Sequence, residues 1–200
     1  MGFAGQSLCA LIALVFLVGS VPAVAQTAGC PGTVTSGLVV EILGGWGGTI
    51  EDPGRLGGML LAGRLGYSVN STAAFNLRFL SANQKGEEVS PGVQADLHVG
   101  TVGADVVLRV LPGSNITPTA ILGYGYSTQI AEGLPVYSGH GVSSGIGVVC
   151  HFSESFALDG SVMVSRTWYE PRTGSAGVLP FTDTRIWGEI GIAFYPGLEF

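Results

Sequence analysis

The chain has few charged residues and no long apolar run beyond its N-terminus. Only 11% of its 200 residues are charged, whereas 46% are hydrophobic and 33 are glycine, an unusual balance for a soluble domain. No stretch after Val18 approaches the roughly 18 consecutive apolar residues that a membrane-spanning helix needs. High hydropathy without helical spans leaves strands that present apolar side chains at alternate positions.

Basic patches, metal-ligand motifs and phosphate-binding loops are also missing. The formal net charge of −6 argues against a nucleic-acid partner. The three histidines are isolated, as are Cys30 and Cys150, so no metal-ligand spacing occurs and we expect no metal and no cofactor. The glycine-rich run 44–48 opens no helix, which excludes a phosphate-binding loop.

Residues 1–25 have the pattern of a cleaved signal peptide. The apolar stretch Leu8–Val18 is followed by a small-residue cleavage site at residues 23–25. The stretch is too short to cross a hydrocarbon core of about 30 Å, which disfavours an uncleaved anchor. Lipidation at Cys30 is a weaker alternative, because Thr27 stands where such motifs usually carry leucine.

Eight segments of alternating hydrophobicity follow, separated by connectors that alternate between long and short. An even number of strands, joined by tight turns at one end and longer loops at the other, is typical of a bacterial outer-membrane barrel. The expected fold is therefore all-β, an eight-stranded antiparallel up-and-down transmembrane β-barrel over residues 35–200, preceded by a short periplasmic segment at 26–34. The segments are 35–48, 58–69, 73–81, 93–111, 116–130, 140–152, 156–170 and 183–195.

Apolar and polar residues fall on opposite faces of these segments. In the last one, Ile190 and Ile192 share an apolar face, while Glu189 lies on the other. A soluble sandwich also alternates, but its strands are nearer 5–6 residues, whereas a tilted spanning strand needs about 9–11. Aromatic residues of the apolar face gather at the segment ends, as in two interfacial girdles. They are Tyr67, Phe75, Phe152, Phe156 and Phe194 at the turn end, and Trp46, Phe79, Tyr126 and Trp168 at the loop end.

The polar face collects charged side chains that we expect to lie inside the barrel. An arginine facing lipid at mid-depth costs about 2–4 kcal/mol, so inward placement is favoured. An eight-stranded barrel is just wide enough for side chains to fill it, which predicts a luminal charge network in preference to an aqueous channel. Its members are Glu41, Arg64, Arg78, Asp105, Arg109, Asp159 and Glu189.

The sequence resembles the small OmpA/OmpX-type outer-membrane barrel domain. The similarity is carried by the A-x-A signal, the strand-turn run Val106–Tyr126, the hairpin Gly145–Val164 and the aromatic-rich end Gly188–Phe200, and it spans nearly all of 26–200. The resemblance implies localisation in the bacterial outer membrane, contact with outer-membrane lipid and lipopolysaccharide, and folding by the outer-membrane assembly machinery. The aromatic residues Phe194, Tyr195 and Phe200 suit the assembly signal that this machinery reads. We expect a monomer.

Catalysis is the main competing interpretation, since barrels of this size include enzymes that modify lipid A. Lipid A deacylases carry a His-x-Ser-Asn motif, of which only His151 and Ser153 are present here, at the turn end. His140 and Ser144 share a strand face, but their Cα atoms are expected about 13 Å apart, too far for a general base to activate a nucleophile. His98 has no partner in the sequence. We therefore expect no catalytic residues.

The prediction from sequence is a non-enzymatic barrel that contributes to membrane integrity or surface interaction. A lipid A-modifying enzyme, a narrow channel and an adhesin remain the alternatives. Loops 82–92 and 171–182 are the expected contact regions, since loops on a rigid scaffold often carry function. Cys30 and Cys150 are expected as free thiols, because their strands lie on different sides of the barrel.

Overall fold

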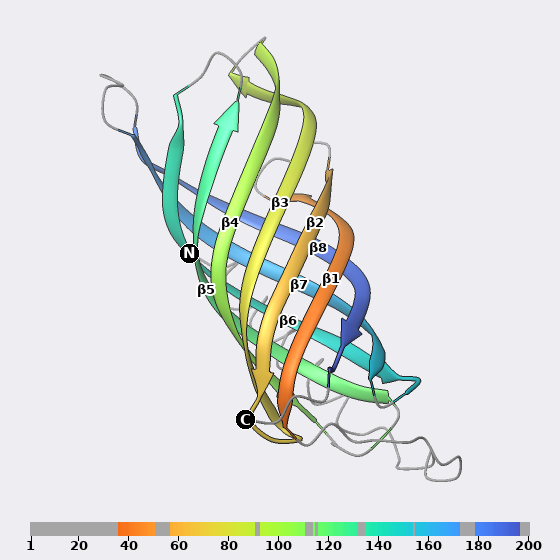
Figure 1. The fold of residues 1–200 in the computed structure, drawn as a ribbon. Helices are drawn as coiled ribbons and strands as arrows, with labels where there is room; N and C mark the ends of the chain where they lie inside the picture. The colour runs from red at the N-terminus through yellow and green to blue at the C-terminus, as the bar shows by residue number, and fades with distance from the viewer. Residues whose placement is uncertain are drawn as a thin grey trace, which may run out of the picture.

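A computed structural model describes eight strands that close into a single barrel (Figure 1). It describes residues 36–50, 57–90, 93–110, 114, 116–131, 135–153, 155–172 and 179–196, with only the backbone at 85–90 and 93–95. The strands are β1 (Gly37–Thr49), β2 (Gly58–Ser68), β3 (Ala73–Ser90), β4 (Val93–Arg109), β5 (Ile116–Ala131), β6 (Tyr137–His151), β7 (Phe156–Pro171) and β8 (Phe181–Phe194).

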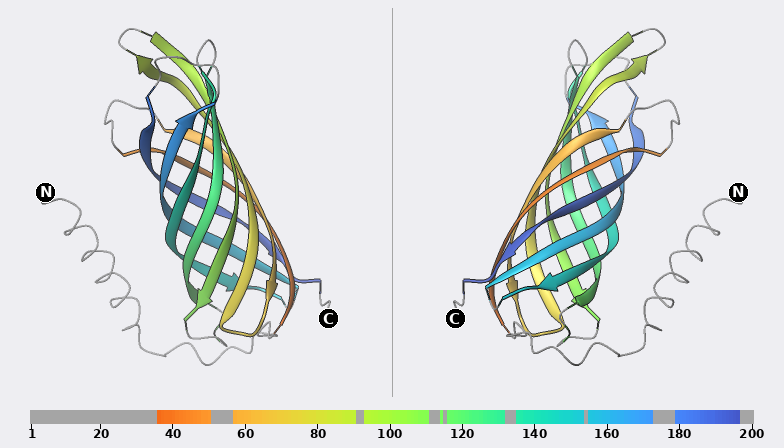
Figure 2. Two further views of the ribbon diagram at one scale, coloured as in Figure 1. Left: turned by 90° about the vertical axis from the view of Figure 1, so that its left-hand side faces the viewer. Right: turned by 90° about the vertical axis from the view of Figure 1, so that its right-hand side faces the viewer.

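Each strand pairs antiparallel with its sequence neighbours, and β1 closes the barrel against β8. The register runs from Val40 opposite Phe194 to Thr49 opposite Arg185. The strands wind steeply around the barrel (Figure 2). The expected eight-stranded antiparallel up-and-down fold is therefore confirmed. No helix that is long and apolar enough to cross a membrane occurs among the described residues.

Burial alternates along the strands as the two-face pattern predicts. In β2, odd positions such as Met59 and Leu61 are 69% and 62% exposed, while Arg64 is 3% exposed. Of the nine expected girdle aromatics, eight are exposed on the outer face and Tyr67 is half-buried. A closed sheet with an apolar exterior is suited to lipid, because its strands pair all the way round the barrel and leave no open edge.

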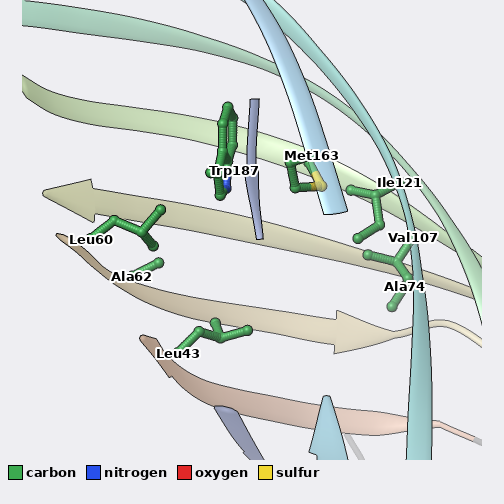
Figure 3. Packing of buried hydrophobic residues seen from close by; sticks show 8 residues of the cluster. All are labelled: Leu43, Leu60, Ala62, Ala74, Val107, Ile121, Met163 and Trp187. Atoms are coloured by element: carbon green, nitrogen blue, oxygen red, sulfur yellow. The ribbon is translucent and has the colours of Figure 1, made fainter. Parts of the chain in front are cut away.

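An inward-facing apolar cluster fills part of the barrel interior. Its buried side chains come from seven of the eight strands and point toward the barrel axis (Figure 3). They are Leu43, Leu60, Ala62, Ala74, Val107, Ile121, Met163 and Trp187. A smaller cluster at the turn end comprises Val39, Val149, Ala157, Ala193 and Tyr195.

The prediction of a loop at residues 82–92 is wrong. Strand β3 continues to Ser90 and β4 begins at Val93, and their pairing extends through Gln84 opposite Leu97 and Glu87 opposite Ala95. Two register irregularities occur in this extension, on either side of the Glu87 and Glu88 pairs. The two strands form a ribbon that projects past the rest of the barrel at its upper end (Figure 2).

Two short turns at the opposite end are closed by side-chain hydrogen bonds. The Asn70 side-chain oxygen accepts hydrogen bonds from the backbone N–H groups of Thr72 and Ala73, both at 2.8 Å. The Ser153 hydroxyl accepts one from the Phe156 N–H at 3.0 Å. Short polar side chains that bond to nearby backbone are favoured in such turns. These turns fix the register of β2 against β3 and of β6 against β7.

The remaining differences from the expected segments are small. Strand β6 begins at Tyr137 instead of residue 140, and β8 begins at Phe181 instead of residue 183. Strand β1 begins at Gly37, close to the expected start of the barrel domain. The expected signal peptide (1–25) and the segment 26–34 lie outside the described residues, so these boundaries stay predictions.

Candidate functional site

The seven charged residues assigned to the lumen are all buried, with exposed fractions between 2% and 7%. Six of them lie in one connected cluster near the middle of the bore, and Arg109 lies apart from it toward the turn end. We call these six the charge cluster. They are Glu41 on β1, Arg64 on β2, Arg78 on β3, Asp105 on β4, Asp159 on β7 and Glu189 on β8.

Arg64 is the centre of the charge cluster. One terminal nitrogen lies 3.0 Å from a Glu41 oxygen and 3.7 Å from an Asp159 oxygen. The other terminal nitrogen contacts Glu189, and the Arg64 Nε lies 3.9 Å from Asp105. A planar guanidinium with five N–H donors can serve several carboxylates at once, which a lysine ammonium cannot do with the same geometry.

Glu189 is held in place by two further donors. The Ser161 hydroxyl donates to one carboxylate oxygen at 2.8 Å, and the Trp187 ring N–H donates to the other at 3.2 Å. Both donors come from residues that the sequence analysis did not select, although Trp187 lies on the same face of β8 as Glu189. The carboxylate therefore keeps a fixed orientation toward Arg64.

Arg78 is the second cation of the charge cluster and stands directly opposite Arg64 in the register of β2 and β3. Like charges at such a position repel one another. Asp105 offsets this repulsion, because its carboxylate lies 3.5 Å from Arg78 and 3.9 Å from Arg64. Arg78 also donates to the Ser143 hydroxyl at 2.9 Å, and its guanidinium lies 5.8 Å from the centre of the Trp187 ring.

Arg109 belongs to the turn end of the lumen. It donates to the Ser68 hydroxyl at 2.9 Å and to the Asn70 carbonyl at 3.4 Å, so it ties β4 to the turn between β2 and β3. Tyr195, which is 4% exposed, lies near Arg109. Tyr195 packs with Val39 and Ala193 as part of an apolar floor at this end.

Inward-facing glycines make room for the charged side chains. A Cβ atom added at Gly123 would collide with the Asp105 carboxylate and the Ser143 hydroxyl. A Cβ atom at Gly188, which faces outward, would meet nothing within 4 Å. The interior is therefore crowded around Gly123, at the level of Asp105, whereas the outer face has space around Gly188.

The bore contains an opening above the charge cluster. A cavity with about 50 Å³ of space for water lies in the loop-side half, lined by small residues and by larger side chains that include Leu60, Arg78, Tyr169, Arg185 and Trp187. Such a volume holds a few water molecules and nothing as large as a sugar or peptide. The lumen is thus filled at the charge cluster and at the apolar floor, but not along its whole length.

Asp183 belongs to the lumen, although the sequence analysis did not assign it there. It lies on β8, is 3% exposed and forms an ion pair with Arg185, which also donates to Gln129 at 3.4 Å. Asp183 and Arg185 share the inward face of β8 with Trp187 and Glu189, so extending that alternation by two residues would have found them.

The structure assigns different surroundings to the three aromatic residues of the expected assembly signal. Phe194 lies on the outer face at 38% exposure and contacts Phe156, with ring centres 5.0 Å apart. Tyr195 points into the lumen, as described above, and Phe200 lies outside the described residues. The role of these residues in assembly stays a prediction.

The histidines considered as catalytic bases contact tyrosine and asparagine side chains. His140 contacts the Tyr124 hydroxyl, with 3.0 Å between the oxygen and Nδ1, and His98 contacts the Asn83 side chain. Ser153 is occupied as the turn acceptor for Phe156. His151 lies beside Tyr195, with ring centres 5.5 Å apart. None of these contacts is a base–nucleophile pair.

Metal-binding groups and disulfides receive no support from the described part of the chain. No cluster of three or more histidine, cysteine, aspartate or glutamate side chains suited to a metal ion occurs there. Cys150 is half-buried and unbridged, and Cys30 lies outside the described residues. The expected redox state of the two thiols therefore stays a prediction.

Comparison with solved structures shows the fold. Neisserial surface protein A (NspA) matches with a TM-score of 0.62 and 12% sequence identity, over 80% of this chain and 96% of that one. The outer membrane protein OprG from Pseudomonas aeruginosa matches with a TM-score of 0.50 and 12% identity, over 82% and 98% of the two chains. No family model matches the sequence, and no curated protein is significantly similar to it. The chain has the small eight-stranded fold of these outer-membrane barrels, as its resemblance to OmpA/OmpX-type domains implied.

Proposed function

We propose that the protein is a non-enzymatic, monomeric outer-membrane barrel that contributes to membrane integrity and to interactions at the cell surface. The observation that carries this proposal is the distribution of side chains, with isoleucine, leucine and phenylalanine outside and buried ion pairs inside. Lipid accommodates such an exterior, whereas water would not. Export through the cleaved signal peptide and insertion by the assembly machinery are part of the proposal.

The closed bore supports a structural or surface role in preference to transport. The charge cluster places Arg64 and four carboxylates across the barrel, and the apolar floor closes its turn end. Solutes of nutrient size would have to displace both. In planar lipid bilayers, the refolded protein should give no discrete openings, and regular steps of conductance would favour the narrow-channel alternative.

The contacts of His140 and His98 support a non-enzymatic role. His140 and His98 have tyrosine and asparagine partners, which hold the rings without supplying an attacking group. Mass spectrometry of lipid A from cells with and without the protein tests this point. Unchanged lipid A masses are expected, and the loss of an acyl chain would establish the lipid A-modifying enzyme instead.

The projecting hairpin of β3 and β4 is the observation that favours a surface interaction. These strands have 18 and 17 residues, compared with 11 in β2, and their ribbon extends past the barrel rim (Figure 2). A paired ribbon is presented in one conformation, so binding costs less ordering entropy than it would for a long unpaired loop. Deleting the ribbon should abolish the protein's contribution to cell or ligand binding at the surface, while the barrel stays folded.

A further inference from the structure

Among the side chains that the structure describes, the outer face of the barrel carries a cation at a strand position bordered mostly by apolar residues. Arg166 on β7 is exposed and stands opposite Val142 on β6 and Thr184 on β8, and its diagonal and same-strand neighbours include Ile186 and Trp168. It forms no hydrogen bond or ion pair with any residue that the structure describes. Arg166 lies ten positions along β7 from Phe156, which corresponds to about 25 Å of height for a strand tilted by about 40°.

That height is the thickness of the apolar band of such barrels, so Arg166 lies at its upper edge. The long apolar part of the side chain can rest against Val142 while the guanidinium reaches the headgroup layer. An unpaired guanidinium at this level requires an anion of the headgroup layer if it is to form a charge-assisted hydrogen bond. A lipid phosphate meets this requirement and matches the guanidinium geometry.

Two polar residues converge on the same place from the neighbouring strands. Val142 on β6 pairs with Arg166 on β7 on one side and with Tyr124 on β5 on the other. His140 lies two residues along β6, on the same outer face and nearer the loop end. These three strands lie side by side in the barrel wall (Figure 1). Arg166, His140 and Tyr124 therefore surround Val142, with diagonal neighbours about 7–8 Å apart.

Tyr124 contacts one side of the His140 imidazole. Nδ1 lies 3.0 Å from the tyrosine hydroxyl, and the two rings are stacked with centres 6.0 Å apart. When the phenol donates to Nδ1, the ring proton resides on Nε2, which then becomes a donor. Tyr126 contacts the same ring edge-on, at 5.2 Å between centres. The imidazole is thus held by two aromatic residues with one nitrogen left for a ligand.

We propose that Arg166, His140 and Tyr124 form a binding site for a phosphate monoester on a lipid of the outer leaflet. The guanidinium and the His140 Nε2–H donate to the phosphate oxygens, and Trp168, opposite His140 in the register, borders the headgroup. The acyl chains lie along Val142 and Ile186 below. This inference rests on the proposed placement in the outer membrane, because the loop end then faces the leaflet that carries phosphorylated glycolipid.

The test uses the full mature chain folded in phosphatidylcholine nanodiscs that contain diphosphorylated lipid A or the same lipid without its phosphates. Native mass spectrometry measures how much lipid A each barrel retains. The wild type should prefer the phosphorylated form, and R166Q and H140Q should each reduce that preference about tenfold, the usual effect of losing one charge-assisted hydrogen bond. Y124F should weaken it less. R172Q, which removes an exposed arginine just beyond β7, is the matched control and should bind like the wild type.

Several outcomes would overturn the site. They are equal retention of both lipids, an unchanged R166Q, an equal loss in R172Q, or equally tight binding of inorganic phosphate added to the wild type in phosphatidylcholine nanodiscs. Heat-modifiable migration on gels verifies that each variant is folded. A folded, inserted barrel without phosphate preference refutes the site alone. A chain that does not insert into nanodiscs refutes the proposed membrane function as well.

Discussion

Removing the Arg64 side chain tests the charge cluster most sharply. In Arg64→Ala, the Glu41, Asp159 and Glu189 carboxylates lose the cation that lies between them, and Asp105 keeps only Arg78. Breaking a buried ion pair by deleting one partner costs about 3–5 kcal/mol, since the remaining charge stays desolvated. With a loss of about 4 kcal/mol and a slope of about 2 kcal/mol per molar urea, the unfolding midpoint should fall by about 2 M.

The assay is reversible urea unfolding of the barrel in lipid vesicles, followed by tryptophan fluorescence. Arg172→Ala is the matched control, because an exposed arginine contributes at most about 1 kcal/mol. The double variant Arg64→Ala/Glu189→Gln should recover part of the loss, because it removes one of the uncompensated carboxylates. Equal midpoints for Arg64→Ala and Arg172→Ala would refute the claim that the inward face of β2 is buried in a charged interior.

Three further predictions concern packing, the bore and the hairpin. Gly123→Ala should destabilise the barrel by about 1–3 kcal/mol, because the added Cβ atom collides with Asp105. Gly188→Ala, on the outer face, should change the free energy of unfolding by less than about 0.5 kcal/mol. Similar urea midpoints for the two variants would contradict the assigned faces. Arg64→Ala should still show no large conductance in planar bilayers, because the apolar floor remains; porin-like steps would show that the charge cluster alone closes the bore. Replacing residues 85–96 by Asn-Gly, which joins the paired Gln84 and Leu97 through a two-residue turn, should shift the free energy of unfolding by less than about 1 kcal/mol. A larger loss would show that the ribbon supports the barrel.

The alternation of apolar and polar residues predicts most of the barrel, because each membrane-level position either faces lipid or faces the lumen. The faces of Glu41, Arg64 and Glu189 follow from this rule alone. The rule fails for residues 82–90 of the expected loop 82–92, since a ribbon beyond the barrel rim has no lipid to select apolar residues on one face. That stretch therefore resembles a polar loop, although its backbone is paired.

The partners within the charge cluster could not be predicted from the sequence. Glu41 faces Arg64 directly in the register of β1 and β2, but Glu189 and Asp159 reach it only because β1 closes against β8. Closure and the stagger of the strands decide which side chains meet across the lumen. The polar group around Val142 was missed for a related reason, because Arg166, His140 and Tyr124 lie on three strands and share no spacing in the sequence.

The central claim is that the barrel spans the outer membrane with its loops outside and its turns inside. Cysteine labelling on intact cells, with a polyethylene-glycol maleimide too large for porins, tests it most directly in a background lacking Cys30 and Cys150. Leu179→Cys, at a loop position that is 79% exposed, should be labelled on intact cells. Thr72→Cys, in the turn between β2 and β3, should be labelled only after permeabilisation. Labelling of Thr72→Cys on intact cells without labelling of Leu179→Cys would invert the topology, and equal labelling of both would contradict a membrane-spanning barrel.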